Sequence, residues 1–107
     1  MSYKIAIIGN EDAINGFKAV GVEAVGVKSV AECQTKLGEL HQSSDYAIIF
    51  ITEDWADKIR KFMDDLPPKA LPSIVAVPSQ TGSTGAGLRS LKKIVEQAVG
   101  SDILSND

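Results

Sequence analysis

Two acidic pairs are the residues of this 107-residue chain that could do chemistry together. Glu11-Asp12 follow the first apolar run of the chain, and Glu53-Asp54 follow the third. If these runs are parallel strands, their carboxyl ends meet at one edge of a sheet, where α/β proteins bind ligands. Because Mg²⁺ prefers oxygen ligands, this edge could hold a magnesium ion beside a phosphate acceptor. The residues expected there are Gly9, Asn10, Glu11, Asp12, Thr52, Glu53, Asp54, Ser79 and Gln80.

An acidic pair after the first strand resembles the pocket of response-regulator receiver domains, but the rest of that pocket is missing. A receiver carries an aspartate at the end of its third strand, where this chain has Ile51-Thr52. It also needs a lysine at the end of a fifth strand, and the sequence predicts no fifth strand. Each acidic pair stands where a helix should begin, and the helix dipole stabilises negative charge there. Capping is the favoured interpretation, and a receiver-like or small-ligand-binding signalling domain is the alternative.

A glycine-rich loop precedes the last predicted helix. Gly82 and Gly87 have the glycine spacing of a P-loop, but Leu88 and Arg89 replace the lysine and hydroxyl residue that would bind phosphate. We therefore expect no nucleotide or other cofactor. The glycines permit tight turns and close backbone approach, so the loop could act as a hinge for the last helix. The predicted hinge residues are Gly82, Gly85 and Gly87.

The remaining reactive side chains form no recognisable set. Cys33 is the only cysteine, which excludes an internal disulfide, and its place on an apolar helix face predicts a core residue. His41 is the only histidine and lies near a helix C-terminus. Trp55 is expected in the core rather than as a stacking platform. With one Cys and one His, neither a usual zinc site nor a catalytic triad can be assembled, so we predict no catalytic and no metal-binding residues.

Charge and hydropathy exclude two classes of partner. The net charge is −3 at pH 7, and Lys and Arg are scattered without a basic stripe, which disfavours nucleic-acid binding. No segment approaches the roughly 18 apolar residues that cross a bilayer, and the N-terminus runs directly into a strand. We expect a cytoplasmic protein without direct membrane insertion.

Hydrophobic periodicity predicts four strands that alternate with four helices. The expected strands are 5–8, 22–27, 46–51 and 74–77. Alternation with short connections favours an α/β fold with a four-stranded parallel sheet, helices on both faces and strand order 2-1-3-4, as in flavodoxin-like and receiver-like proteins. We expect residues 1–80 to form the compact domain. Residues 81–107 should form the glycine loop, an amphipathic helix and a short tail that could be mobile.

Local signals set the expected helices. The first should span Glu11 to Val20, weakened by Gly16. The second should follow the N-cap Ser29, with Glu32 as its capping-box partner. Its predicted inner face is Val30, Cys33, Leu37 and Leu40. The third should be capped by Thr52 and end at Pro67-Pro68, with an inner face of Trp55, Ala56, Ile59, Phe62, Met63 and Leu66. Gly100 should stop the fourth.

Several segments together resemble a known family. They are Lys4–Asp12 with Gly16-Phe17, Ile49–Glu53, Pro72–Ser79, Gly82, Gly85–Leu88 and Val95–Leu104. In this order and spacing they resemble the F subunits of the rotary A-type and V-type ATPases. The likeness spans the whole chain, and it departs only by a few extra residues around Pro67-Pro68 and after Leu104.

The resemblance implies a non-catalytic rotor subunit of the central stalk. Such a protein binds the coiled coil of the D subunit, and its C-terminal helix approaches the catalytic A and B subunits. Rotation then couples ATP synthesis or hydrolysis to proton or sodium transport, and the rotor protein stays peripheral to the membrane. A helix-in-groove contact through the last helix and tail is the expected interface. The residues expected in it are Leu88, Leu91, Ile94, Val95, Val99, Ile103 and Leu104. The alternative, that this helix packs fully on its own sheet, stays open.

Overall fold

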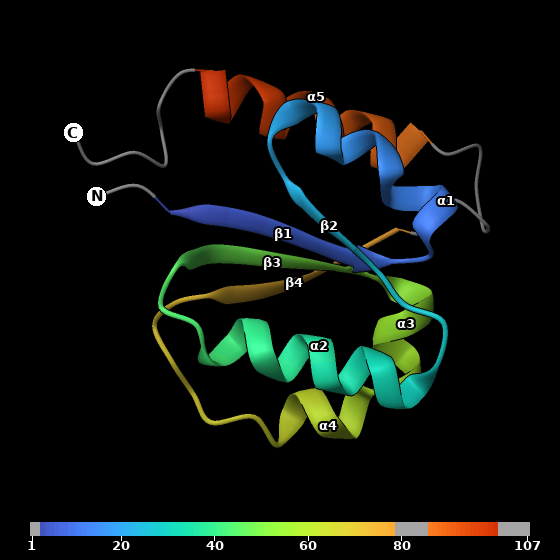
Figure 1. The fold of residues 1–107 in the computed structure, drawn as a ribbon, viewed down its shortest axis with the longest axis vertical. Coiled ribbons are helices and arrows are strands. Elements are labelled where there is room, and N and C mark those ends of the chain that lie inside the picture. The colour runs from blue at the N-terminus through green and yellow to red at the C-terminus, as the bar shows by residue number, and fades with distance from the viewer. Residues whose placement is uncertain (1–2, 79–85, 101–107) are drawn as a thin grey trace.

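The computed structural model describes residues 3–78 and 86–100, with side chains described for 3–78 and 90–97. Four parallel strands form one sheet in the order β2-β1-β3-β4 (Figure 1). Their bounds are β1 (Lys4–Gly9), β2 (Glu23–Gly26), β3 (Tyr46–Thr52) and β4 (Ser73–Val77). The predicted α/β class, parallel sheet and strand order are confirmed.

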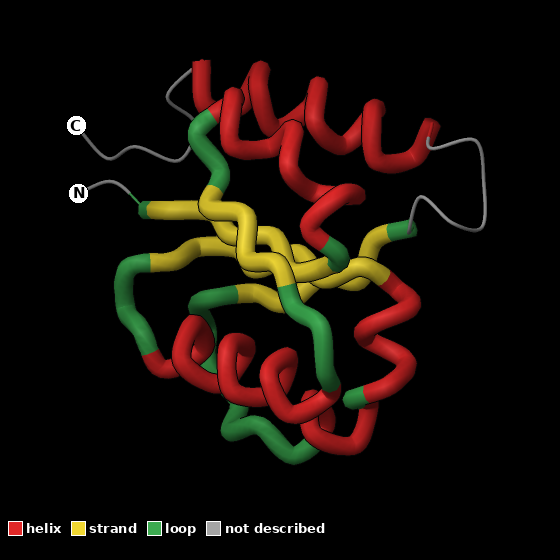
Figure 2. Tube along the Cα trace, turned by 45° about the vertical axis from the view of Figure 1, so that its right-hand side comes forward, coloured by secondary structure: helices red, strands yellow, loops and turns green. Residues whose placement is uncertain are grey.

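Helices cover both faces of the sheet, as predicted (Figure 2). One layer holds α1 (Glu11–Ile14), the 3₁₀ helix η1 (Asn15–Val20) and α5 (Ala86–Gly100). The other holds α2 (Val30–Gln42), α3 (Glu53–Lys58) and α4 (Arg60–Asp64). Among the described residues, no helix is long and apolar enough to cross a membrane.

β1 supplies side chains to both layers because successive residues of a strand point to opposite faces. Ala6 and Ile8 belong to the core beneath α2 and α3, whereas Ile5 and Ile7 belong to the core beneath η1 and α5. Burial on both faces explains why β1 reads as a continuous apolar run rather than an alternating one.

The first connection differs from the single helix predicted for 11–20. Only Glu11–Ile14 is α-helical, and Asn15–Val20 continues as a 3₁₀ helix. Glycine at position 16 weakens α-helical propensity, which favours this change to a tighter coil. Gly21 then ends the segment with φ of 86°, a left-handed conformation that glycine adopts without strain.

The cap of α2 is close to the prediction, but one residue of its inner face is not. Ser29 Oγ accepts a hydrogen bond from the Glu32 N–H, while Glu32 Oε1 accepts from the N–H of Lys28 rather than of Ser29. Cys33, Leu37 and Leu40 are buried, whereas Val30 is 42% exposed. As the first helical residue, Val30 lies at the rim of the apolar stripe, about 50° from the direction of the other three.

The third predicted helix is broken in two at Ile59. This residue has φ of −123° and ψ of 26°, and its N–H donates to the carbonyl of Ala56 instead of Trp55. A β-branched residue loses side-chain freedom in a helix, so a break costs least at such a position. The predicted inner face survives the break, because Trp55 and Ile59 are buried and Phe62 packs against them.

Candidate functional site

The acidic residues at the carboxyl edge of the sheet begin helices, as the capping interpretation predicts. Glu11 and Asp12 form the first turn of α1, and Glu53 and Asp54 form the first turn of α3. Thr52, which replaces a receiver's phosphoacceptor, is 1% exposed. Within 3–78 and 90–97, no group of three or more His, Cys, Asp or Glu side chains could hold a metal ion. Ser79 and Gln80 lie outside the described residues.

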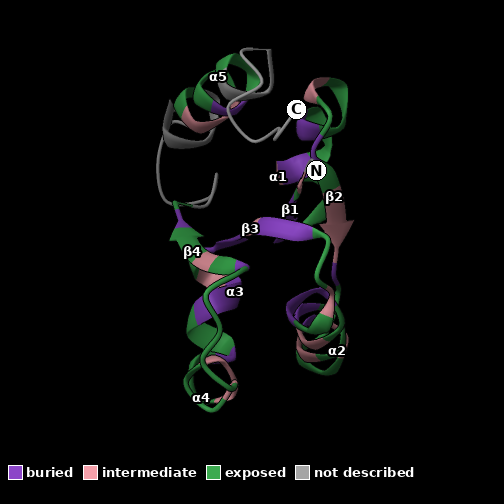
Figure 3. Cartoon of the chain, turned by 90° about the vertical axis from the view of Figure 1, so that its left-hand side faces the viewer, coloured by how far each residue is buried: buried purple, intermediate pink, exposed green. Residues whose placement is uncertain are grey.

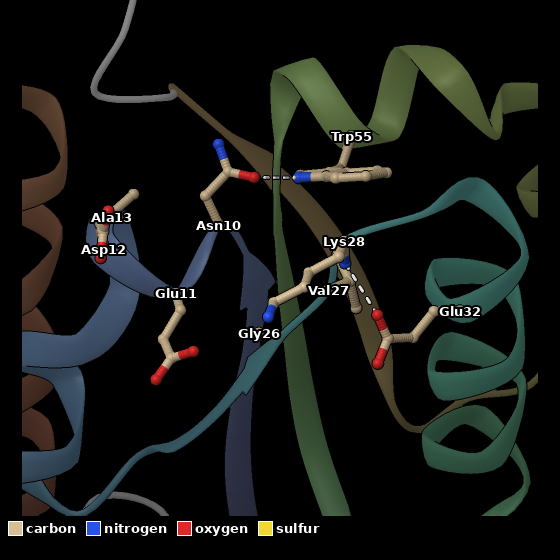
Figure 4. Close-up of a pocket in the computed structure, with 9 residues that line it drawn as sticks. All are labelled: Asn10, Glu11, Asp12, Ala13, Gly26, Val27, Lys28, Glu32 and Trp55. Carbon is tan, nitrogen blue, oxygen red and sulfur yellow. Dashed lines mark hydrogen bonds between the residues drawn. The ribbon is translucent and has the colours of Figure 1, made fainter.

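Asn10 and Trp55 connect two elements at this edge (Figure 4). The indole N–H of Trp55 donates to Asn10 Oδ1 over 2.8 Å, and this bond joins the end of β1 to α3. Lys58 Nζ lies 4.4 Å from the centroid of the Trp55 ring, within reach of a cation–π interaction. Trp55 is 6% exposed, so it is a core residue with one polar contact and not a stacking platform.

A depression of about 670 Å³ opens beside this contact. Glu11 and Asp12 are on one side of it, and Lys28, Glu32 and Trp55 are on the other (Figure 4). Glu32 already accepts a hydrogen bond from the backbone of Lys28. Charges of both signs line a wide opening, and this arrangement selects no single ligand class.

The Asn10–Trp55 hydrogen bond should be measurable in a double-mutant cycle. Asn10→Ala and Trp55→Phe each remove it, and their coupling energy should be about 1 kcal/mol because a protein hydrogen bond contributes that much net. Urea unfolding of the two single variants and the double variant measures the coupling. If the loss of unfolding free energy in the double variant equals the sum of the two single losses, the contact does not stabilise the fold.

Cys33 and His41 both lie in the α2 layer. Cys33 is fully buried in the core, as predicted, and burial together with the negative charge of Asp54 raises the pKa of its thiol to about 11. His41 is 5% exposed at the end of α2, where Lys69 Nζ donates to its backbone oxygen. A cation at that point satisfies a helix C-terminal carbonyl. These features stabilise α2 and supply no nucleophile.

The α5 helix divides the residues predicted to contact a partner. Val95 is 4% exposed, and it and Leu91 pack in the core with Ile7 and Phe50. Ile94 is 62% exposed on the same helix. The side chains of Leu88 and Val99 are outside those described, as are Ile103, Leu104, Gly82 and Gly85 altogether, and Gly87 lies in the first turn of α5.

A family comparison decides what kind of protein carries these features. The family model described as "ATP synthase (F/14-kDa) subunit" matches residues 5–95. The chain belongs to this family. The match includes all four strands except Lys4, the first residue of β1, and the part of α5 that carries Leu91, Ile94 and Val95.

Named relatives of this F subunit agree over nearly the full length. The F subunit of the V-type ATP synthase of Clostridium botulinum (strain Eklund 17B / Type B) is 32% identical over 97% of the chain and 100% of the relative. The protein of the same name in Fusobacterium nucleatum is 33% identical over 97% of the chain and 98% of the relative. The F subunit of the A-type ATP synthase of Thermococcus kodakarensis is 35% identical over 94% of the chain and 97% of the relative. These names confirm the resemblance read from the sequence, and they describe one component of an ATP synthase.

Proposed function

We propose that this F subunit is a non-catalytic rotor component of the central stalk of a V/A-type ATPase. It binds the coiled coil of the D subunit and rotates with it, while ATP synthesis or hydrolysis takes place on the A and B subunits. Rotation couples that chemistry to proton or sodium transport. The protein works at the cytoplasmic side, peripheral to the membrane, and contributes no active site and no cofactor of its own.

The exposure of Ile94 is the observation that supports a docking role for α5. Leu91 and Val95 already seat the helix on its own sheet, so Ile94 is not needed for that packing. A large apolar side chain that remains exposed on a seated helix suits a helix-in-groove contact, in which it enters the groove of a coiled coil. One stripe of α5, with Leu91 and Val95, packs on the sheet, and the flank beside it, with Ile94, remains for a partner.

Movement of α5 belongs to the same proposal. Gly82, Gly85 and Gly87 would act as the hinge, and Leu88, Val99, Ile103 and Leu104 would join the contact with the D subunit or with the A and B subunits. Repositioning of this segment would then regulate ATP hydrolysis.

Co-expression with the D subunit, followed by size-exclusion chromatography and calorimetry, tests the proposal. The intact pair should form a one-to-one complex. Ile94→Asp should weaken it at least tenfold, because a charge in an apolar pocket loses its hydration without gaining a partner. No complex between two folded proteins would contradict the stalk assignment.

Val30→Asp is the matched control for that substitution. Val30 is also an exposed aliphatic residue, but it begins α2 in the other helix layer. It should leave the affinity for the D subunit unchanged. If Ile94→Asp binds as well as this control, α5 in its seated position is not the docking surface.

A further inference from the structure

Three exposed apolar side chains gather around β4. Among the described residues, four large hydrophobic side chains are exposed: Val30, Leu71, Val75 and Ile94. Leu71 closely precedes β4, and Val75 is its middle residue. Val75 is 40% exposed, and it is paired in register with Phe50, whose side chain lies in the core beneath α5. Val75 therefore points to the face of the sheet that α5 covers.

Ile94 points toward the same margin of the molecule. Gly16 lies in η1, and a Cβ built on it would lie 3.6 Å from Lys92 Nζ. Lys92 therefore faces η1. Ile94 is two residues further along, about 200° around the helix, and so faces away from η1. Because η1 packs beside β2, at the opposite end of the sheet, this flank of α5 faces the β4 side (Figure 3).

The outer edge of β4 presents a row of backbone donors and acceptors that no other described residue pairs with. Within the described residues, β4 pairs only with β3 and ends the sheet. No turn, loop or cap hydrogen bond in this part of the chain involves positions 73–77. Edge strands are normally protected by charged side chains, prolines or bulges, yet Ser73-Ile-Val-Ala-Val77 contains none of these.

We propose that β4 pairs edge to edge with β4 of a second copy of this chain. Two-fold symmetry makes the two strands antiparallel, and pairing centred on Val75 joins both sheets into one. β4 carries no charge, so no like charges meet across the symmetry axis. A second extended strand offers a matching row of donors and acceptors, whereas a coiled coil, whose backbone groups are bonded within its helices, offers none.

This symmetry also accounts for the exposure of Ile94 and Val75. A two-fold axis perpendicular to the joined sheet keeps both α5 helices on the same face. The Ile94 flank of each helix then faces that of the other copy, above the two Val75 side chains. Pairing thus covers apolar surface as well as the open backbone groups.

Sedimentation equilibrium of the isolated chain at increasing concentration tests the pairing. The mass should rise toward twice the 11.4 kDa of one chain. Val75→Lys should weaken self-association more than tenfold, because it places two like charges at the axis. Val30→Lys, at an equally exposed valine of the other layer, should associate like the unmodified chain. Hydrogen exchange of the unmodified chain gives a readout without any variant, since amides of β4 should gain protection as concentration rises.

A chain that stays monomeric at every concentration, or a folded Val75→Lys variant that still dimerises, would overturn the proposal. The test is independent of the stalk assignment, because it needs no other protein. Both associations use Ile94, so Ile94→Asp should weaken both of them. Val75→Lys should weaken only self-association and still bind the D subunit.

Discussion

Replacing Gly9 with alanine is expected to lower the free energy of unfolding by about 3 kcal/mol, the upper range for overpacking a core. A Cβ at this position would lie 2.9 Å from Cγ2 of Thr52 and 3.0 Å from Cγ2 of Ile14. Both neighbours are buried, so neither can move aside without disturbing the sheet or α1. Urea unfolding followed by circular dichroism measures the loss.

Gly38→Ala is the matched control for this prediction. Gly38 lies inside α2, and a Cβ there would meet only Phe62 Cζ at 3.7 Å, an ordinary contact distance. Because alanine is the better helix former, this variant should be more stable by roughly 0.5–1 kcal/mol. Equal effects of the two substitutions would show that close packing at Gly9 does not limit stability.

The role of Gly9 illustrates what the sequence could and could not predict at the carboxyl edge. The position of Gly9 after the first strand was predictable, since an apolar run closed by glycine and asparagine indicates a strand end. The contact of Thr52 with Gly9 could not be predicted, because it depends on the register between β1 and β3. The same holds for the Asn10–Trp55 hydrogen bond, which joins residues 45 positions apart. No local pattern encodes such a pair.

The fold itself followed from local patterns that tertiary packing did not override. Continuous apolar runs indicated strands buried on both faces, and alternation with helices favoured parallel pairing and the strand order of flavodoxin-like proteins. Ser29 marked the start of α2 correctly. The errors lie where several backbone states are close in energy. Ile59 breaks a helix whose apolar periodicity continues through the break, and Asn15–Val20 forms a 3₁₀ coil instead of an α-helix.

Periodicity also could not separate the two sides of α5. The helix carries apolar residues around much of its circumference, and the sequence alone gives no reason to place Ile94 apart from Leu91 and Val95. The position of η1 makes the difference, because Lys92 lies toward it and thereby shows which way each side of the helix faces. A partner-binding surface on such a helix can be identified only when the elements that pack against the helix are known.

Raising the pH above 9 should destabilise this protein through Cys33. Burial raises the pKa of this thiol from 9.0 to about 11, so the folded state holds its proton when the unfolded state has lost it. The stabilising contribution is complete below the unfolded pKa and is lost as pH rises from 9.0 toward 11. The full loss is roughly 3 kcal/mol, since one pKa unit corresponds to about 1.4 kcal/mol.

Cys33→Ala removes the titrating group and isolates its contribution. The variant should be less stable near neutral pH, because it leaves a small cavity, but its stability should fall less steeply above pH 9.0. Tyr46 also has a raised pKa, about 12, from burial and the neighbouring Glu23 carboxylate, and it should destabilise the fold only above its unfolded pKa of 10.0. Urea unfolding between these two onsets therefore follows Cys33 and not Tyr46. Parallel curves for the two proteins in that interval would mean that Cys33 ionises as readily in the folded protein as in the unfolded chain, and thus that the α2 core admits water.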